Sequence, residues 1–169
     1  MAKNRWKEVE EVILSQGAEA VRQVDPKNVR TGEWVRLKCQ YGCSGYGKCL
    51  TCPPISPTPS QTRRLLDEYS VGFVTYWGRK WPGRKVLAGI EREAFLKGWY
   101  KAFIMGSGPC DLCERCDVDN ECRHPHLARP AMEACGIDVF QTARDAGFPI
   151  EVVTRRKEKP NFYSLLLVE

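Results

Sequence analysis

Long apolar runs and the short motifs of common enzyme classes are both missing from this chain of 169 residues. Its longest apolar run, residues 165–168, has four residues, far short of the roughly 20 that cross a bilayer. Residues 1–11 are charged throughout and lack the apolar core of a signal peptide. We therefore expect a cytoplasmic protein without a membrane-spanning segment.

The missing motifs include the P-loop, the dinucleotide-binding glycine motif, the serine nucleophile elbow and the H-E-x-x-H zinc motif. Whether the protein is an enzyme therefore stays open at this point. The net charge is +5, but the basic residues form short scattered pairs such as Arg63-Arg64. Nucleic-acid binding typically needs a dense basic stripe, so we expect no nucleic-acid partner.

The composition is that of a globular protein, with 43% hydrophobic and 28% charged residues, and the length predicts a single domain over residues 1–169. Apolar spacing predicts helices over 5–16, 60–69, 84–105 and 138–146. Strands are predicted over 20–24, 33–37, 71–77, 150–154 and 163–168, the last two as a terminal hairpin. This pattern predicts an α/β fold, with α+β as a variant: one small mixed sheet flanked by helices, and a cysteine-rich metal lobe at one end.

Cysteine is unusually frequent, with nine residues against two histidines. An odd number cannot form a complete disulfide framework, and a chain of this length does not need one for stability. In a reducing cytoplasm, clustered cysteines are more often metal ligands or catalysts. Eight of them form two runs of four: Cys39, Cys43, Cys49 and Cys52, then Cys110, Cys113, Cys116 and Cys122. Four thiolates complete the shell of an iron–sulfur cluster, and equally of a structural zinc ion.

The spacing within the runs favours iron–sulfur clusters. A zinc ribbon presents two cysteine pairs separated by roughly 12 residues or more, and neither run contains such a loop. Cys110, Cys113 and Cys116 match the first three positions of the bacterial ferredoxin signature, whereas Cys122 lies two residues late. We predict two [4Fe-4S] clusters, held by segments 38–54 and 106–139 in one cofactor lobe, with two zinc ions as the alternative.

The first run is less diagnostic by itself. Its spacing misses that of radical S-adenosylmethionine enzymes. Cys49 and Cys52 could form a redox dithiol, but Pro53 and Pro54 block the helix N-terminus that lowers the pKa of such a thiol. We predict that each run holds its own site, and an exchange of Cys52 and Cys122 between the sites is the alternative.

Three further residues lie near the second run. Cys135 stands alone, and we expect it to be a small buried apolar residue. His124 and His126 follow Cys122 closely, but four cysteines already close the shell. We expect both histidines to support the ligands by hydrogen bonding and not to bind the metal directly.

The cysteine runs, together with CRHP (122–125) and RPAMEACGIDV (129–139), resemble a prokaryotic family of uncharacterised, predicted metal-binding proteins classed as a domain of unknown function. The resemblance implies that the eight cysteines of the two runs are the metal ligands. The resemblance also includes a second stretch in which eight residues match the family: Arg129, Pro130, Met132, Glu133, Ala134, Gly136, Ile137 and Asp138. Within this stretch the chain has Ala131 where the family has serine. It implies a metal but no reaction.

Three functions follow from the sequence. The first is an iron–sulfur protein that transfers electrons to a redox partner protein. The second is an enzyme whose substrate binds at one cluster, and the third is a protein stabilised by structural zinc. Five acidic residues and one arginine lie within 110–122, whereas segment 38–52 has two lysines and no acid. For the first function, this difference predicts a lower reduction potential at the second run.

Overall fold

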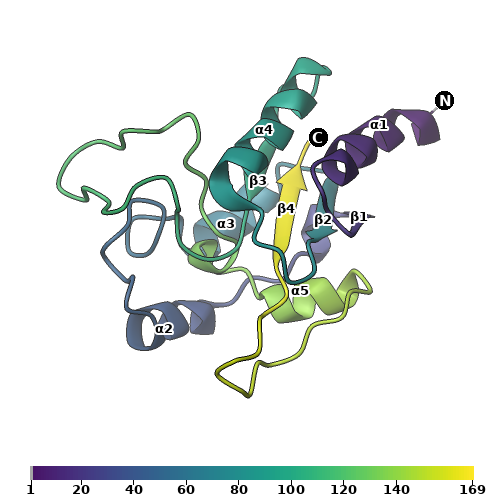
Figure 1. Ribbon diagram of the computed structural model, residues 1–169. Coiled ribbons are helices and arrows are strands. Elements are labelled where there is room, and N and C mark those ends of the chain that lie inside the picture. Colours follow the sequence, from purple (N-terminus) through teal and green to yellow (C-terminus); the bar gives the residue numbers. More distant parts are fainter. Residues whose placement is uncertain (1) are drawn as a thin grey trace.

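A four-stranded sheet forms the centre of the fold, and helices cover both of its faces (Figure 1). The computed structural model describes residues 2–169, and the side chains from residue 5 onward. The strands β1 (Ala20–Val24), β2 (Gly72–Tyr76), β3 (Phe103–Met105) and β4 (Tyr163–Leu167) lie in the order β1-β2-β4-β3. The last strand of the chain therefore lies between two earlier ones.

The sheet separates two hydrophobic clusters because successive side chains of a strand point to opposite faces. Leu165 and Leu167 of β4 pack into the cluster that contains residues of α3 (Pro59–Leu66) and α5 (Val139–Asp145). Leu166 packs into the opposite cluster, with residues of α1 (Ala2–Ser15) and α4 (Gly83–Leu96). All five residues of β4 are buried, which explains the apolar run near the end of the sequence.

The predicted fold class is confirmed: one small sheet is flanked by helices. The three pairs between the described strands are antiparallel, and a single parallel bridge joins Gly106 to Ala131. This is the α+β variant of the prediction. Among residues 2–169, no helix is both long and apolar enough to span a membrane.

The strand predicted over 33–37 is wrong, because this segment begins α2 (Glu33–Gly42). The order polar, apolar, apolar, polar, apolar over these five residues does not have the strict alternation of a half-buried strand. Val35 is buried, whereas Trp34 and Leu37 are exposed. Glu33 lies in the first turn, where a negative charge stabilises a helix.

Two further predictions on secondary structure need correction. The helix predicted over 84–105 ends at Leu96, since Gly98 takes a φ of 100° that stops the helix and lets the chain return as β3. Residues 150–154 form no strand, and the predicted terminal hairpin does not exist. Both edges of β4 are already paired, with β2 on one side and β3 on the other.

Candidate metal centre

The two cysteine runs lie on segments with little regular structure beyond one end of the sheet (Figure 1). Cys39 lies in the last turns of α2, and the amide of Cys43 donates to the carbonyl of Cys39, 3.3 Å away, where the helix ends. The second run follows β3 directly, in the long irregular segment 107–130. The fold thus brings together two segments that are about sixty residues apart in the sequence.

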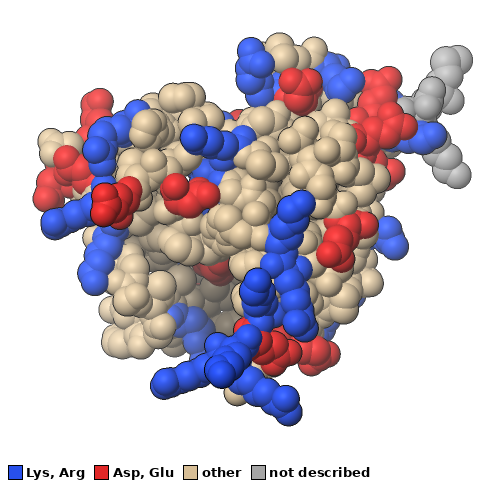
Figure 2. All heavy atoms as spheres, in the orientation of Figure 1, with Lys and Arg blue, Asp and Glu red and all other residues tan. Residues whose placement is uncertain are grey.

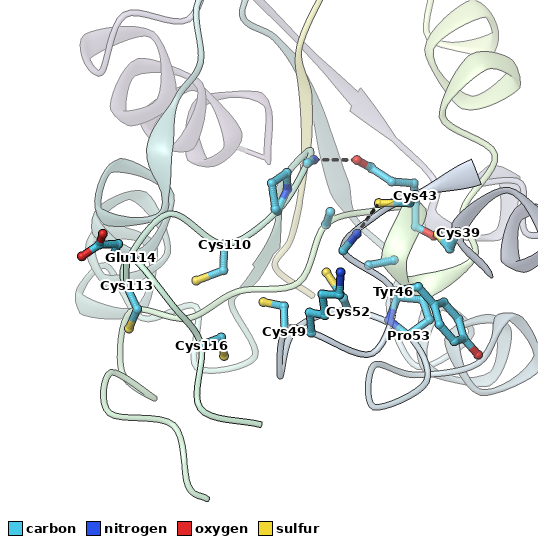
Figure 3. Close-up of a pocket in the computed structure, with 17 residues that line it drawn as sticks. Cys39, Cys43, Tyr46, Cys49, Cys52, Pro53, Cys110, Cys113, Glu114 and Cys116 are labelled. Carbon is cyan, nitrogen blue, oxygen red and sulfur yellow. Dashed lines mark hydrogen bonds between the residues drawn. The ribbon is translucent and has the colours of Figure 1, made fainter. Parts of the chain in front are cut away.

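A cavity of about 250 Å³ lies between these segments (Figure 3). Seven of the eight cysteines predicted as ligands line it: Cys39, Cys43, Cys49, Cys52, Cys110, Cys113 and Cys116. In Figure 3, Cys49 stands between Cys52 on one side and Cys110 and Cys116 on the other. Within residues 2–169, no three His, Cys, Asp or Glu side chains are grouped closely enough to hold one metal ion.

The eighth cysteine lies on a neighbouring cavity of about 30 Å³. Cys122 and His124 line this smaller cavity, whereas His126 is not part of its wall. Four cysteines of the larger cavity also line the smaller one: Cys49, Cys110, Cys113 and Cys116. All eight predicted ligands therefore lie on one or both of two adjoining cavities.

Backbone amides point at several of the sulfur atoms. The amide of Leu50 donates to Cys116 Sγ, and the amide of Gly45 donates to Cys43 Sγ, each at 3.4 Å. Hydrogen bonds of this kind stabilise a thiolate and are among the factors that set the reduction potential of an iron–sulfur cluster.

The pKa values of the Cys49 and Cys52 thiols shift in opposite directions. A hydrogen bond from Cys52 lowers the pKa of the Cys49 thiol to about 4, and further bonds from Thr51 and the amide of Cys110 act in the same direction against the effect of burial. The same bond raises the pKa of Cys52, because it stabilises the protonated form. Cys49 is thus the thiolate of the pair.

Burial is the first cause that raises the pKa of three other thiols: Cys39, Cys110 and Cys116. These groups are protonated at neutral pH in the metal-free protein. Metal binding must therefore release protons from this site.

Arg84 anchors the second cysteine segment to helix α4, and this role was not predicted from the sequence. Its guanidinium is fully buried and donates to the carbonyls of Arg129, Ser107 and Gly108 at 2.7, 3.2 and 2.6 Å. Its amide donates to Asp111 Oδ1 at 2.9 Å. The helix α4 thereby fixes the chain on both sides of the run, and one positive charge lies close to Cys110.

Two acidic residues also position the site. Glu133 lines the larger cavity and accepts the amide of Gly108 at 2.6 Å, and burial raises the pKa of its carboxyl group. Glu91 on α4 forms a two-point ion pair with Arg129, with nitrogen–oxygen distances of 2.6 and 2.7 Å. Asp138, from the stretch shared with the family, caps α5 by accepting the amide of Gln141.

The lone cysteine behaves as predicted. Cys135 is fully buried in the core beside α3 and α5, and burial raises the pKa of its thiol to about 12. It lines neither of the two cysteine cavities.

A third cavity of about 510 Å³ adjoins the larger cysteine cavity, and Gly108 and Glu133 form part of both walls. Its lining is mainly apolar and includes Trp34, Phe140 and Phe162. Figure 2 shows a hollow on this side of the molecule, between the positions of α2 and the segment that leads into β4. Lys and Arg atoms crowd its lower edge.

The comparisons with known proteins agree with the site. Neither curated proteins nor solved structures gave a match to the chain. The family described as "Predicted metal-binding protein (DUF2284)" matches residues 22–168, which include both cysteine runs and the stretch from Arg129 to Asp138. The resemblance predicted from the motifs is thereby confirmed, and the chain belongs to the DUF2284 family of predicted metal-binding proteins.

Proposed function

We propose that the protein is an iron–sulfur protein of the cytoplasm that carries two [4Fe-4S] clusters and transfers electrons to a partner protein. The observation that carries this proposal is the convergence of both cysteine runs on two adjoining cavities. Thiolates are soft ligands that select iron–sulfur clusters, zinc and copper(I) over hard cations. The donor set of eight thiols therefore fits the proposed cofactor, and the clusters would supply one-electron chemistry.

The spacing of the second run supports clusters over zinc. Cys110, Cys113 and Cys116 keep the two-residue gaps of a ferredoxin run, and the amide of Leu50 already donates to one of these sulfurs. Structural zinc remains the competing assignment, because four thiolates also complete its shell.

The position of the first run supports electron transfer. Cys43 is exposed, and the same helix presents Trp34, Leu37 and Tyr41 to solvent, with Tyr41 80% exposed. These three residues are spaced by three and four positions, so they share one face of α2. A partner that docks there would come close to a cluster held by this run.

The test is metal and sulfide analysis of protein purified without oxygen. We expect about eight irons and eight acid-labile sulfides per chain, with the brown colour typical of such clusters. Cys135→Ala is the matched control, because it removes a cysteine outside both cavities and should leave the iron content unchanged. Two zinc ions without sulfide in the anaerobic protein would overturn the proposal and favour the structural zinc site.

A second function, an enzyme whose substrate binds beside a cluster, is favoured by the third cavity. Its 510 Å³ lies within the usual range of ligand pockets, about 300–1,000 Å³. Fluorine NMR with a library of fluorinated fragments tests whether it binds small molecules. Val153→Trp should block binding because Val153 lines the cavity, whereas Val152→Trp, one residue away and outside the lining, should not. If no fragment binds the wild-type protein and fails to bind Val153→Trp, this second function is refuted.

A further inference from the structure

We propose that Cys49 leaves its own run and joins the second one, so that Cys49, Cys110, Cys113 and Cys116 hold one cluster. The three remaining thiols on the larger cavity, those of Cys39, Cys43 and Cys52, then hold the other cluster and leave one of its ligand positions open. This inference rests on the proposed iron–sulfur function and specifies its ligand sets. It differs from the division by run that the sequence spacing predicts.

The walls of the two cysteine cavities carry the first part of the argument. The residues common to both walls are four cysteines and nothing else: Cys49, Cys110, Cys113 and Cys116. These four thiols therefore form the wall that separates the larger cavity from the smaller one. Cys39, Cys43 and Cys52 lie only on the larger cavity, and Cys122 lies only on the smaller one.

A hydrogen bond ties the neighbour of Cys49 to the second run. The amide of Leu50, the residue after Cys49, donates to Cys116 Sγ at 3.4 Å. Cys49 itself lies between Cys52 on one side and Cys110 and Cys116 on the other (Figure 3), so it stands at the junction of the two ligand sets.

The open ligand position follows from the cysteines that remain for the second cluster. Cys122 is separated from the larger cavity by the wall of four thiols, so it is not placed to complete the set of Cys39, Cys43 and Cys52. An iron that lacks a protein ligand accepts a small donor, and soft anions such as thiolates suit such a site. Lys48 lines the same cavity and supplies a positive charge that favours an anionic ligand.

Cys49→Ser and Cys52→Ser form a matched pair of variants, because both change one cysteine of the same run. The readouts are iron content and the electron paramagnetic resonance spectrum of the reduced, anaerobically reconstituted protein. We expect Cys49→Ser to lose the same signal as Cys116→Ser, and Cys52→Ser to lose the other signal. Loss of one and the same signal in Cys49→Ser and Cys52→Ser, with the signal lost in Cys116→Ser retained, would overturn the inference.

A thiol probe tests the open position separately. Mercaptoethanol added to the wild-type protein should shift the signal that depends on Cys52 and leave the signal that depends on Cys49 unchanged. An unchanged spectrum in both signals would show that the ligand sets are complete, and would refute the open position.

Failure of the proposed function has a different outcome. If the protein holds neither iron nor sulfide, the ligand sets can still be read from cobalt(II) titrations, in which thiolate–cobalt absorption reports each site. Cys49→Ser and Cys116→Ser should then both lose the thiolate–cobalt absorption of the same site. Circular dichroism of each variant establishes that it is folded, and Cys→Ala replacements at the same positions serve where a serine variant does not fold.

Discussion

Replacing Arg84 by methionine should weaken the anchor of the second cysteine segment more than any surface change on the same helix. The guanidinium donates to three backbone carbonyls, and its side chain is fully buried. It forms no ion pair with a described carboxylate. Methionine keeps the volume and the apolar stem but has no N–H groups to donate.

The magnitude follows from the three carbonyls that lose their partner. Each buried unsatisfied polar group costs about 1–3 kcal/mol. Part of this cost is returned, because the buried cation had itself lost its hydration. We therefore expect a net loss of about 3 kcal/mol in the free energy of unfolding, a large share of the roughly 5–15 kcal/mol that stabilises a domain.

Urea unfolding of the metal-free, reduced protein measures this loss. With a slope of about 2 kcal/mol per M, the midpoint should fall by about 1.5 M. Arg92→Met is the matched control, since Arg92 is exposed on the same helix and should shift the midpoint by less than about 0.3 M. Equal midpoints for the two variants would refute the anchoring role of Arg84.

Three further predictions follow from the same contacts. Glu91→Gln should expose segment 106–131 to faster amide hydrogen exchange because it removes the charge that holds Arg129, whereas Glu93→Gln, an exposed neighbour, should not. In urea unfolding, Gly136→Ala should lower the free energy of unfolding by about 2–4 kcal/mol, and Gly147→Ala by only about 1 kcal/mol. Both glycines have a φ of 77°, but only at Gly136 would the added Cβ lie against a proline ring, that of Pro59, at 2.3 Å. Equal losses in the two variants would contradict this steric argument. Cys135 should react last with iodoacetamide because its side chain is fully buried, and early labelling mapped by mass spectrometry would refute this. Burial also raises its pKa to about 12; since this folded pKa lies above the ordinary 9.0, its contribution to stability is complete below pH 9 and falls as the pH rises towards 12.

The candidate metal ligands could be selected from the sequence because cysteine spacing is local information. All eight cysteines of the two runs line the adjoining cavities, as the motifs predict for a single lobe. What the spacing could not provide was the relation between the runs. The contact of Leu50 with Cys116 joins residues 66 positions apart, and nothing within either run encodes it.

Helix α2 and Arg84 show two different reasons for failure. Residues 33–37 show no strict alternation, and in so short a window the packing that decides between strand and helix comes from distant residues. Arg84 had a usable signal: it lies three residues before Leu87, a fully buried residue, so both share the inner face of α4. A charged residue on a buried stripe indicates a buried hydrogen-bonding role, and this rule would have identified it.

Opposite charges on the two cysteine segments favour their association as well as different reduction potentials. Lys48 from the first segment and Glu114 from the second line the same cavity, so the two segments bring opposite charges to it. Asp111 accepts hydrogen bonds from the amide of Arg84 and from the indole N–H of Trp81. Its carboxylate therefore stabilises the fold at the start of α4. Apart from Cys39 at the end of α2, the cysteines of both segments lie outside regular structure, and thiols from both segments line one cavity. A cluster with ligands from both would form only when the segments close on each other, so metal binding and the ordering of this lobe should be one coupled event.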